Sequence, residues 1–124
     1  MRVLLADDNR DVLAVTQAML AVEGHEVCVA VNGAEAVRLF QEQAFDVVVL
    51  DIEMPVMNGW SALAAIRLLP AGRQVPVILF TAYYNSQYEA RAANAGADLL
   101  VHKPMTSNDF VLLLEGIDEW RKSR

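Results

Sequence analysis

The chain has 124 residues, 55% of them hydrophobic and 21% charged, and its formal net charge is −6 at pH 7. This length fits one domain, which we place at residues 1–124 with its core from about 2 to 121, and the hydrophobic content excludes a disordered chain. The acidic balance argues against direct nucleic-acid binding, and no hydrophobic run reaches the roughly 18 residues of a membrane span.

Five short hydrophobic runs alternate with helical patterns along the chain. The runs cover residues 3–6, 27–31, 47–50, 77–80 and 99–101. Four of them are continuous, which is typical of parallel strands covered by helices on both faces. The run at 27–31 alternates large and small residues, which favours an edge strand. Its Cys28 is expected to be a small core or half-buried residue rather than a reactive thiol or a metal ligand.

A helix is predicted after each strand. The fourth helix is recognised by its ends, since residues 86–89 resemble a capping box and Gly96 is typical of a helix end. Gly24 likewise marks the end of the first helix. Residues 106–109 resemble the cap that begins the last helix. The side chains expected to face inward on the other helices are Val12, Val15, Met19 and Val22, then Val37, Phe40 and Ala44, then Leu63, Ile66 and Leu69, and finally Phe110, Leu113, Leu114, Ile117 and Trp120. Five strand–helix units predict an α/β fold with a parallel sheet between helices.

Polar side chains follow four of the five predicted strands. Asp7 and Asp8 follow the first, Asp51 the third, Thr81 the fourth and Lys103 the fifth. Each alone could be a helix cap, a turn residue or a surface residue. Ligands of parallel sheets bind beyond the carboxyl ends of the strands, so the coincidence at four strand ends predicts one site.

The residue types at these ends point to phosphoryl transfer. Two carboxylates about 4 Å apart repel by about 4 kcal/mol at an effective dielectric near 20, so Asp7, Asp8 and Asp51 need compensating positive charge. Lys103 supplies part of it, and an all-oxygen ligand set favours Mg²⁺, with Mn²⁺ possible, for the rest. An aspartate such as Asp51 can then attack phosphorus, while the hydroxyl of Thr81 binds a phosphoryl oxygen.

These residues resemble those of the receiver domains of bacterial response regulators, the CheY-like superfamily, over nearly the whole chain. The resemblance rests on Asp7-Asp8, on residues 51–59 around the acceptor aspartate, on Thr81-Ala82, on Gly96-Ala97-Asp98 and on Lys103-Pro104. It implies a flavodoxin-like, doubly wound sheet of five parallel strands in the order 2-1-3-4-5, with five helices.

The same resemblance implies a function in two-component signalling. A histidine kinase or histidine phosphotransfer protein would donate a phosphoryl group to Asp51. Asp8, Asp51 and the backbone carbonyl of Glu53 would hold Mg²⁺, with Asp7 acting mainly through water. The protein would be a cytoplasmic switch rather than an enzyme, without membrane contact, acting on an unknown protein target. It would be a monomer or a weak dimer through the last two helices and the strand between them.

One position departs from the family pattern. Leu100 stands three residues before the lysine, where the family usually has an aromatic residue that turns inward on activation. We therefore hypothesise that Tyr83 or Tyr84, close after Thr81 and Ala82, takes part of this switching role. Glu53 and Tyr83 are expected to tune the lifetime of the acyl phosphate.

Two alternative functions remain open on the sequence. A metal-dependent phosphatase could use Asp51 as nucleophile, although Glu53 stands where such enzymes often carry a second aspartate. A pseudo-receiver scaffold would never take phosphate, and Leu100 slightly favours it. Acetyl phosphate with Mg²⁺ separates the three, since it gives a stable phosphate, turnover or no reaction.

Overall fold

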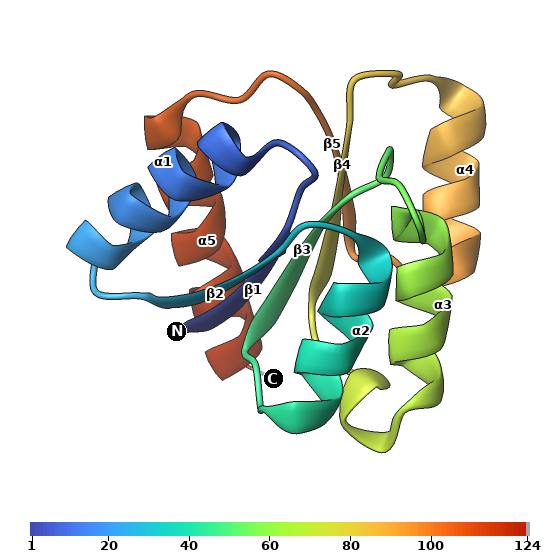
Figure 1. Ribbon diagram of the computed structural model, residues 1–124, viewed down its shortest axis with the longest axis horizontal. Helices are drawn as coiled ribbons and strands as arrows, with labels where there is room; N and C mark the ends of the chain where they lie inside the picture. Colours follow the sequence, from blue (N-terminus) through green and yellow to red (C-terminus); the bar gives the residue numbers. More distant parts are fainter. Residues whose placement is uncertain (124) are drawn as a thin grey trace.

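The computed structural model describes residues 1–123 and consists of a five-stranded sheet between two layers of helices (Figure 1). The strands are β1 (Arg2–Ala6), β2 (Glu26–Ala30), β3 (Val47–Asp51), β4 (Val77–Thr81) and β5 (Leu99–His102). The helices are α1 (Arg10–Val22), α2 (Gly33–Glu42), α3 (Gly59–Leu68), α4 (Ser86–Ala95) and α5 (Ser107–Lys122), with a short 3₁₀ turn at Pro70–Gly72.

The sheet has the order β2-β1-β3-β4-β5, and every neighbouring pair is parallel. This confirms the predicted flavodoxin-like α/β fold and the edge position of β2. Each predicted strand is found within one residue at either end. Asp51 and Thr81 prove to be the last residues of β3 and β4 rather than the first residues after them.

Two hydrophobic cores lie on opposite faces of the sheet. Helices α1 and α5 cover one face and α2, α3 and α4 the other (Figure 1). On β4, Val77 and Leu79 belong to the core beneath α3, while Ile78 and Phe80 belong to the core beneath α1 and α5. Successive side chains of a strand point to opposite faces, so a continuous hydrophobic run serves both cores.

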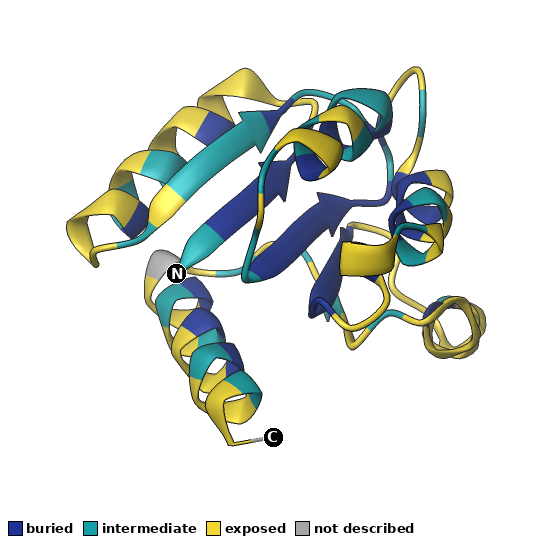
Figure 2. Ribbon diagram, turned by 90° about the horizontal axis from the view of Figure 1, so that it is seen from below, coloured by how far each residue is buried: buried dark blue, intermediate teal, exposed yellow. Residues whose placement is uncertain are grey.

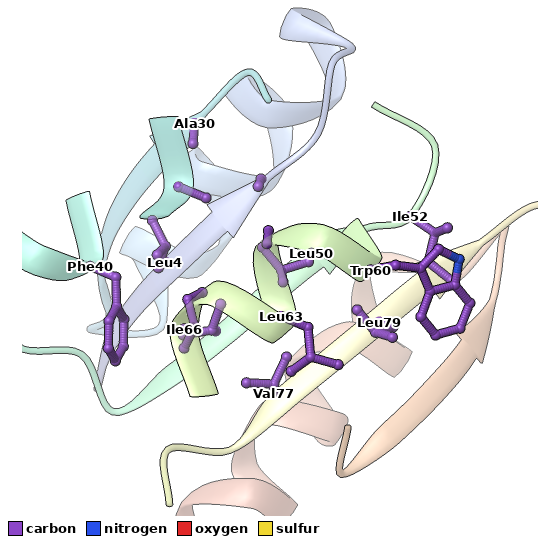
Figure 3. Packing of buried hydrophobic residues seen from close by; sticks show 14 of the residues in the cluster. Leu4, Ala30, Phe40, Leu50, Ile52, Trp60, Leu63, Ile66, Val77 and Leu79 are labelled. Carbon is purple, nitrogen blue, oxygen red and sulfur yellow. The ribbon is translucent and has the colours of Figure 1, made fainter. Parts of the chain in front are cut away.

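Burial follows this layered arrangement. The central strands β3 and β4 are buried along their whole length, and Figure 2 shows the exposed residues on the outer surfaces of the helices. In Figure 3, Leu63 of α3 lies beside Val77 of β4, and Ile66 lies on the side of α3 nearer to Phe40, all within one core cluster. Among residues 1–123, no helix combines the length and the hydrophobicity that crossing a bilayer requires.

Side-chain caps define where the helices begin. The caps of α1, α2, α3, α4 and α5 are Asn9, Asn32, Asn58, Asn85 and Thr106. The capping box predicted at Ser86 is wrong by one residue, because the Asn85 side chain accepts the hydrogen bond from the Tyr88 N–H at 2.8 Å. Gly24 and Gly96 follow the ends of α1 and α4 in the left-handed region, as predicted.

The inward face of α1 also differs from the prediction. Leu13 and Leu20 are buried, whereas Val15 and Val22 are 65% and 84% exposed and Val12 is also exposed. Leucine and valine stripes both have helical spacing, and burying the leucines removes more apolar surface from water. The Gln17 amide donates to the Val27 carbonyl of β2 at 2.9 Å, which is consistent with α1 turning its leucines rather than its valines toward the sheet.

Two other predicted inward-facing residues are exposed. Ala44 lies beyond the last residue of α2, and Trp120 is 40% exposed near the end of α5. Cys28 is half-buried as predicted, and its thiol lies 3.5 Å from Oε1 of Gln43.

Candidate functional site

The candidate site lies at the carboxyl edge of the sheet, on the three strands β1, β3 and β4 and the segment after β5. The register pairs Ala6 with Leu50 and Asp51 with Phe80. Asp51 therefore ends the central strand, with Asp7 beyond β1 on one side and Thr81 at the end of β4 on the other. This follows from parallel strands of equal length, which bring residues distant in sequence to one edge.

Lys103 joins the two buried acids of the site. Its Nζ lies 2.9 Å from Oδ2 of Asp7 and 3.0 Å from Oδ2 of Asp51. The two aspartate side chains are 8% and 7% exposed. Burial by itself lowers the pKa of Lys103, but the hydrogen bonds to both carboxylates outweigh it and leave that pKa raised. The ammonium group is therefore charged at neutral pH.

The Asp51 carboxylate has a hydrogen-bond partner at only one of its two oxygens among the described residues. Burial raises its pKa, the hydrogen bond from Lys103 opposes that rise, and the charges of Asp7 and Glu53 add to it. Its Oδ1 is buried and makes no hydrogen bond to any described residue. An ionised carboxylate with one free buried oxygen favours a further cation or an electrophile at that oxygen.

The acids could hold a divalent cation. One carboxylate oxygen each of Asp7, Asp8 and Asp51 lie within 4.8 Å of one another, and Asp8 is exposed to solvent. Both oxygens of Asp7 are engaged, Oδ1 by the Asn9 N–H and Oδ2 by Lys103, which suits a contact to the ion through water. A set of oxygen ligands without His or Cys fits Mg²⁺ or Mn²⁺ rather than Zn²⁺.

Thr81 contacts a residue whose side chain was not expected to reach it. The buried Thr81 hydroxyl lies 3.0 and 3.1 Å from the two oxygens of the Glu53 carboxylate. The Ala82 N–H donates to the same carboxylate at 3.3 Å, and the Tyr83 N–H donates to Thr81 Oγ1 at 2.9 Å. From the sequence, Glu53 was predicted to bind the metal ion through its backbone carbonyl and to tune the acyl phosphate, but no contact of its side chain with Thr81 was predicted, since nothing in the pattern pairs that side chain with β4.

The loop after Asp51 is held by a close backbone approach. The Gly59 N–H donates to the Ile52 carbonyl at 2.9 Å, and a Cβ at Gly59 would lie 2.5 Å from the Asp51 carbonyl oxygen. Glycine at this position therefore lets α3 begin directly against the end of β3. Within the loop Val56 has φ +67°, a left-handed conformation that is strained for a β-branched residue.

The proposed switch residues lie on and beside β5. Leu100 is half-buried and packs against the core beneath α4. Tyr84 stacks on the ring of His102 at the end of β5, with the ring centroids 5.6 Å apart, whereas Tyr83 is 65% exposed. Of the two tyrosines, Tyr84 has a ring contact with β5, so it fits the hypothesised switching role better.

The sequence matches the family model described as the response regulator receiver domain over residues 3–115. The chain belongs to the response regulator receiver family. This receiver domain has the CheY-like fold and is of the kind that works in two-component phosphorelay signalling.

Individual relatives agree with this assignment. The chemotaxis protein CheY4 of Vibrio cholerae superposes with a TM-score of 0.89 at 27% identity, over 94% of this chain and 97% of that one. The receiver domain of the sensor histidine kinase PA1611 from Pseudomonas aeruginosa, solved with magnesium in its active-site cleft, gives a TM-score of 0.82 at 31% identity over 96% and 95%. The transcriptional regulatory protein PrrA of Mycobacterium tuberculosis is 38% identical over 94% of this chain. The chain spans about half of the length of PrrA.

Proposed function

We propose that this receiver domain accepts a phosphoryl group on Asp51 from a histidine kinase or a histidine phosphotransfer protein, and that residues 1–124 form one switching domain. The observation that carries the proposal is the state of the Asp51 carboxylate. Its Oδ2 is bound to the Lys103 ammonium, while its buried Oδ1 has no hydrogen-bond partner among the described residues. One oxygen is thus anchored, and the other is available to attack phosphorus.

The residues of the site have distinct tasks in this reaction. Asp51 forms an oxygen–phosphorus bond as the phosphorus–nitrogen bond of the donor phosphohistidine breaks, and the donor imidazole takes a proton as it leaves. Lys103 neutralises the charge on the phosphoryl oxygens, and the Thr81 hydroxyl and the Ala82 N–H donate to one of them. Asp51 and Thr81 end adjacent strands, Ala82 follows β4 and Lys103 follows β5, so the four groups lie at the same edge of the sheet.

Mg²⁺ is the proposed cofactor, and Mn²⁺ could replace it. Asp8, Asp51 and the backbone carbonyl of Glu53 would hold the ion, with Asp7 acting through water. When bound, the ion would neutralise the acids and the incoming phosphoryl oxygens. The clustering of Asp7, Asp8 and Asp51 supports this set, as does the magnesium in the PA1611 receiver domain.

The partner surfaces follow from the position of the site. A protein that delivers a phosphoryl group must cover the surface next to Asp7 and Asp51, and α1 begins there at Arg10 with the exposed Val12 and Val15. We assign this face of α1 to the phosphodonor protein. The domain acts as a switch on a protein target, as a monomer or a weak dimer through α4, β5 and α5. Exposed Leu99 and Leu112 on β5 and α5 support that surface.

Intact mass spectrometry tests the proposal. Wild type and Asp51→Asn are incubated with acetyl phosphate and Mg²⁺, and the mass is followed over time. We expect one phosphoryl group on wild type, none on Asp51→Asn, and loss of labelling when EDTA removes the metal. Continuous release of phosphate would instead indicate a phosphatase, and an unchanged wild-type mass would indicate a silent scaffold.

A further inference from the structure

We propose that the Glu53 carboxylate occupies, in the unphosphorylated protein, the position that a phosphoryl oxygen takes after phosphorylation. It would then compete with the phosphoryl group for Thr81 and Ala82 and hold the end of β4 in its resting state. This inference rests on the proposed function, because it concerns the group that Asp51 is proposed to accept.

The two donors expected for the phosphoryl group are both engaged by Glu53. The Thr81 hydroxyl lies 3.0 and 3.1 Å from the two carboxylate oxygens, and the Ala82 N–H donates to one of them at 3.3 Å. A hydroxyl and a neighbouring backbone N–H directed at one anionic group form an anion-binding arrangement. In the resting structure, the anion bound there belongs to the protein itself.

The Thr81 hydroxyl cannot serve both anions at once. It has one proton, and the Tyr83 N–H already donates to its oxygen at 2.9 Å. The side chain is fully buried, so water offers no alternative partner. Thr81 must therefore release Glu53 before it can donate to a phosphoryl oxygen on Asp51.

Charge acts in the same direction as geometry. Asp51 ends the strand next to the one that Thr81 ends, and the charge of Glu53 contributes to the raised pKa of Asp51. A phosphoryl group adds further negative charge at this edge of the sheet, which increases its repulsion of the Glu53 carboxylate. Phosphorylation would thus both take the donors of Glu53 and repel its side chain.

Release of Glu53 would give this receiver domain a switching step that needs no aromatic residue at position 100. Glu53 lies in the loop that connects β3 to α3, and Thr81 ends β4 just before the segment that leads to α4. Breaking their contact removes a side-chain link between these two segments. This coupling acts between neighbouring loops on the same edge of the sheet, without a ring turning inward from β5.

Binding of beryllium fluoride, a phosphoryl analogue, with Mg²⁺ tests the inference. Affinity is measured by calorimetry for wild type, Glu53→Gln and Glu53→Ala, with Glu119→Gln on α5 as the control for loss of one exposed carboxylate. Both Glu53 variants should bind at least about tenfold more tightly, as expected from removing one charge-assisted competitor, and the control should match wild type. The Ala82 amide resonance should also shift in the two variants before any analogue is added.

The outcomes separate this inference from the proposed function. If wild type binds the analogue and both Glu53 variants bind it equally or more weakly, the competition is refuted while the phosphoacceptor role stands. If wild type neither binds beryllium fluoride nor takes phosphate from acetyl phosphate, both proposals fail. Circular dichroism confirms that each variant is folded, and because Gln keeps the size of Glu, it separates charge from packing.

Discussion

Replacing Lys103 by methionine removes the ammonium group that the buried carboxylates of Asp7 and Asp51 share. The substitution keeps most of the side-chain volume and removes its charge and its hydrogen bonds at 2.9 and 3.0 Å. Two acids that are almost fully buried then face each other without compensation. We expect the variant to fold with lower stability and to show a different dependence of stability on pH.

The size of the effect follows from the distances. Carboxylate oxygens of Asp7 and Asp51 lie within 4.8 Å of each other, where two charges repel by about 3.5 kcal/mol at an effective dielectric near 20. Removing one partner of a buried ion pair typically costs about 3–5 kcal/mol. Proton uptake by Asp51 limits this cost, so we expect the free energy of unfolding to fall by about 2–4 kcal/mol at pH 7.5.

The cost should shrink in acid. Burial raises the pKa of Asp51 already in the wild type, and loss of Lys103 removes the interactions that oppose that rise. A carboxyl group whose pKa is higher in the folded state than in the unfolded chain favours folding less as pH rises between those two values. The variant should therefore lose stability from weakly acidic to neutral pH, and Mg²⁺ should restore part of it at neutral pH.

Urea denaturation at several pH values, with and without Mg²⁺, measures these changes. Lys122→Met is a matched control because Lys122 is the other lysine of the chain. It lies 66% exposed against Asp118, and its loss should cost about 0.5 kcal/mol or less. Equal losses for the two variants, or a loss at Lys103 that does not change with pH, would refute the electrostatic account.

Two further changes affect the acceptor strand and its loop. Asp51→Asn should raise the free energy of unfolding at pH 7 by about 0.5–2 kcal/mol, because burial raises the pKa of Asp51 and disfavours its ionised form in the folded state. The gain should vanish near pH 3, where the carboxyl group is protonated in both the folded and the unfolded state. Thermal melts at several pH values measure this dependence. Val56→Gly should stabilise the protein by up to about 1 kcal/mol, since left-handed strain of about 1–2 kcal/mol exceeds the added chain entropy of glycine. Val22→Gly, at a helical position, should destabilise it in the same urea titration, and destabilisation by both changes would contradict the strain at Val56.

The sequence allowed the fold and the membership of the site to be predicted because both depend on short-range patterns. Continuous hydrophobic runs identified the buried strands, and the residues at their ends pointed to one edge of the sheet. Asp7, Asp51 and Lys103 then had to meet, since parallel strands of similar length end together.

Other features depend on a choice between two residues or two helix faces that the sequence pattern supports equally well. Leucines and valines are both spaced to form an inward face on α1, and the leucines are buried. Asn85 and Ser86 are both good helix caps, and the difference is one residue. The contact of Glu53 with Thr81 depends on the path of a loop and on one side-chain rotamer, so it could only be seen in three dimensions.

Helix α4 rests on α3 through aromatic and arginine side chains. Its one buried residue is Ala92, and the Trp60 ring from the first turn of α3 packs edge-on against Tyr88 and lies 4.2 Å from the guanidinium carbon of Arg91. Arg67 of α3 also donates to the Gly96 carbonyl at the end of α4 at 2.7 and 3.0 Å. Helix α3 therefore supports α4 at both ends, and the loop that carries Glu53 ends just before this support begins.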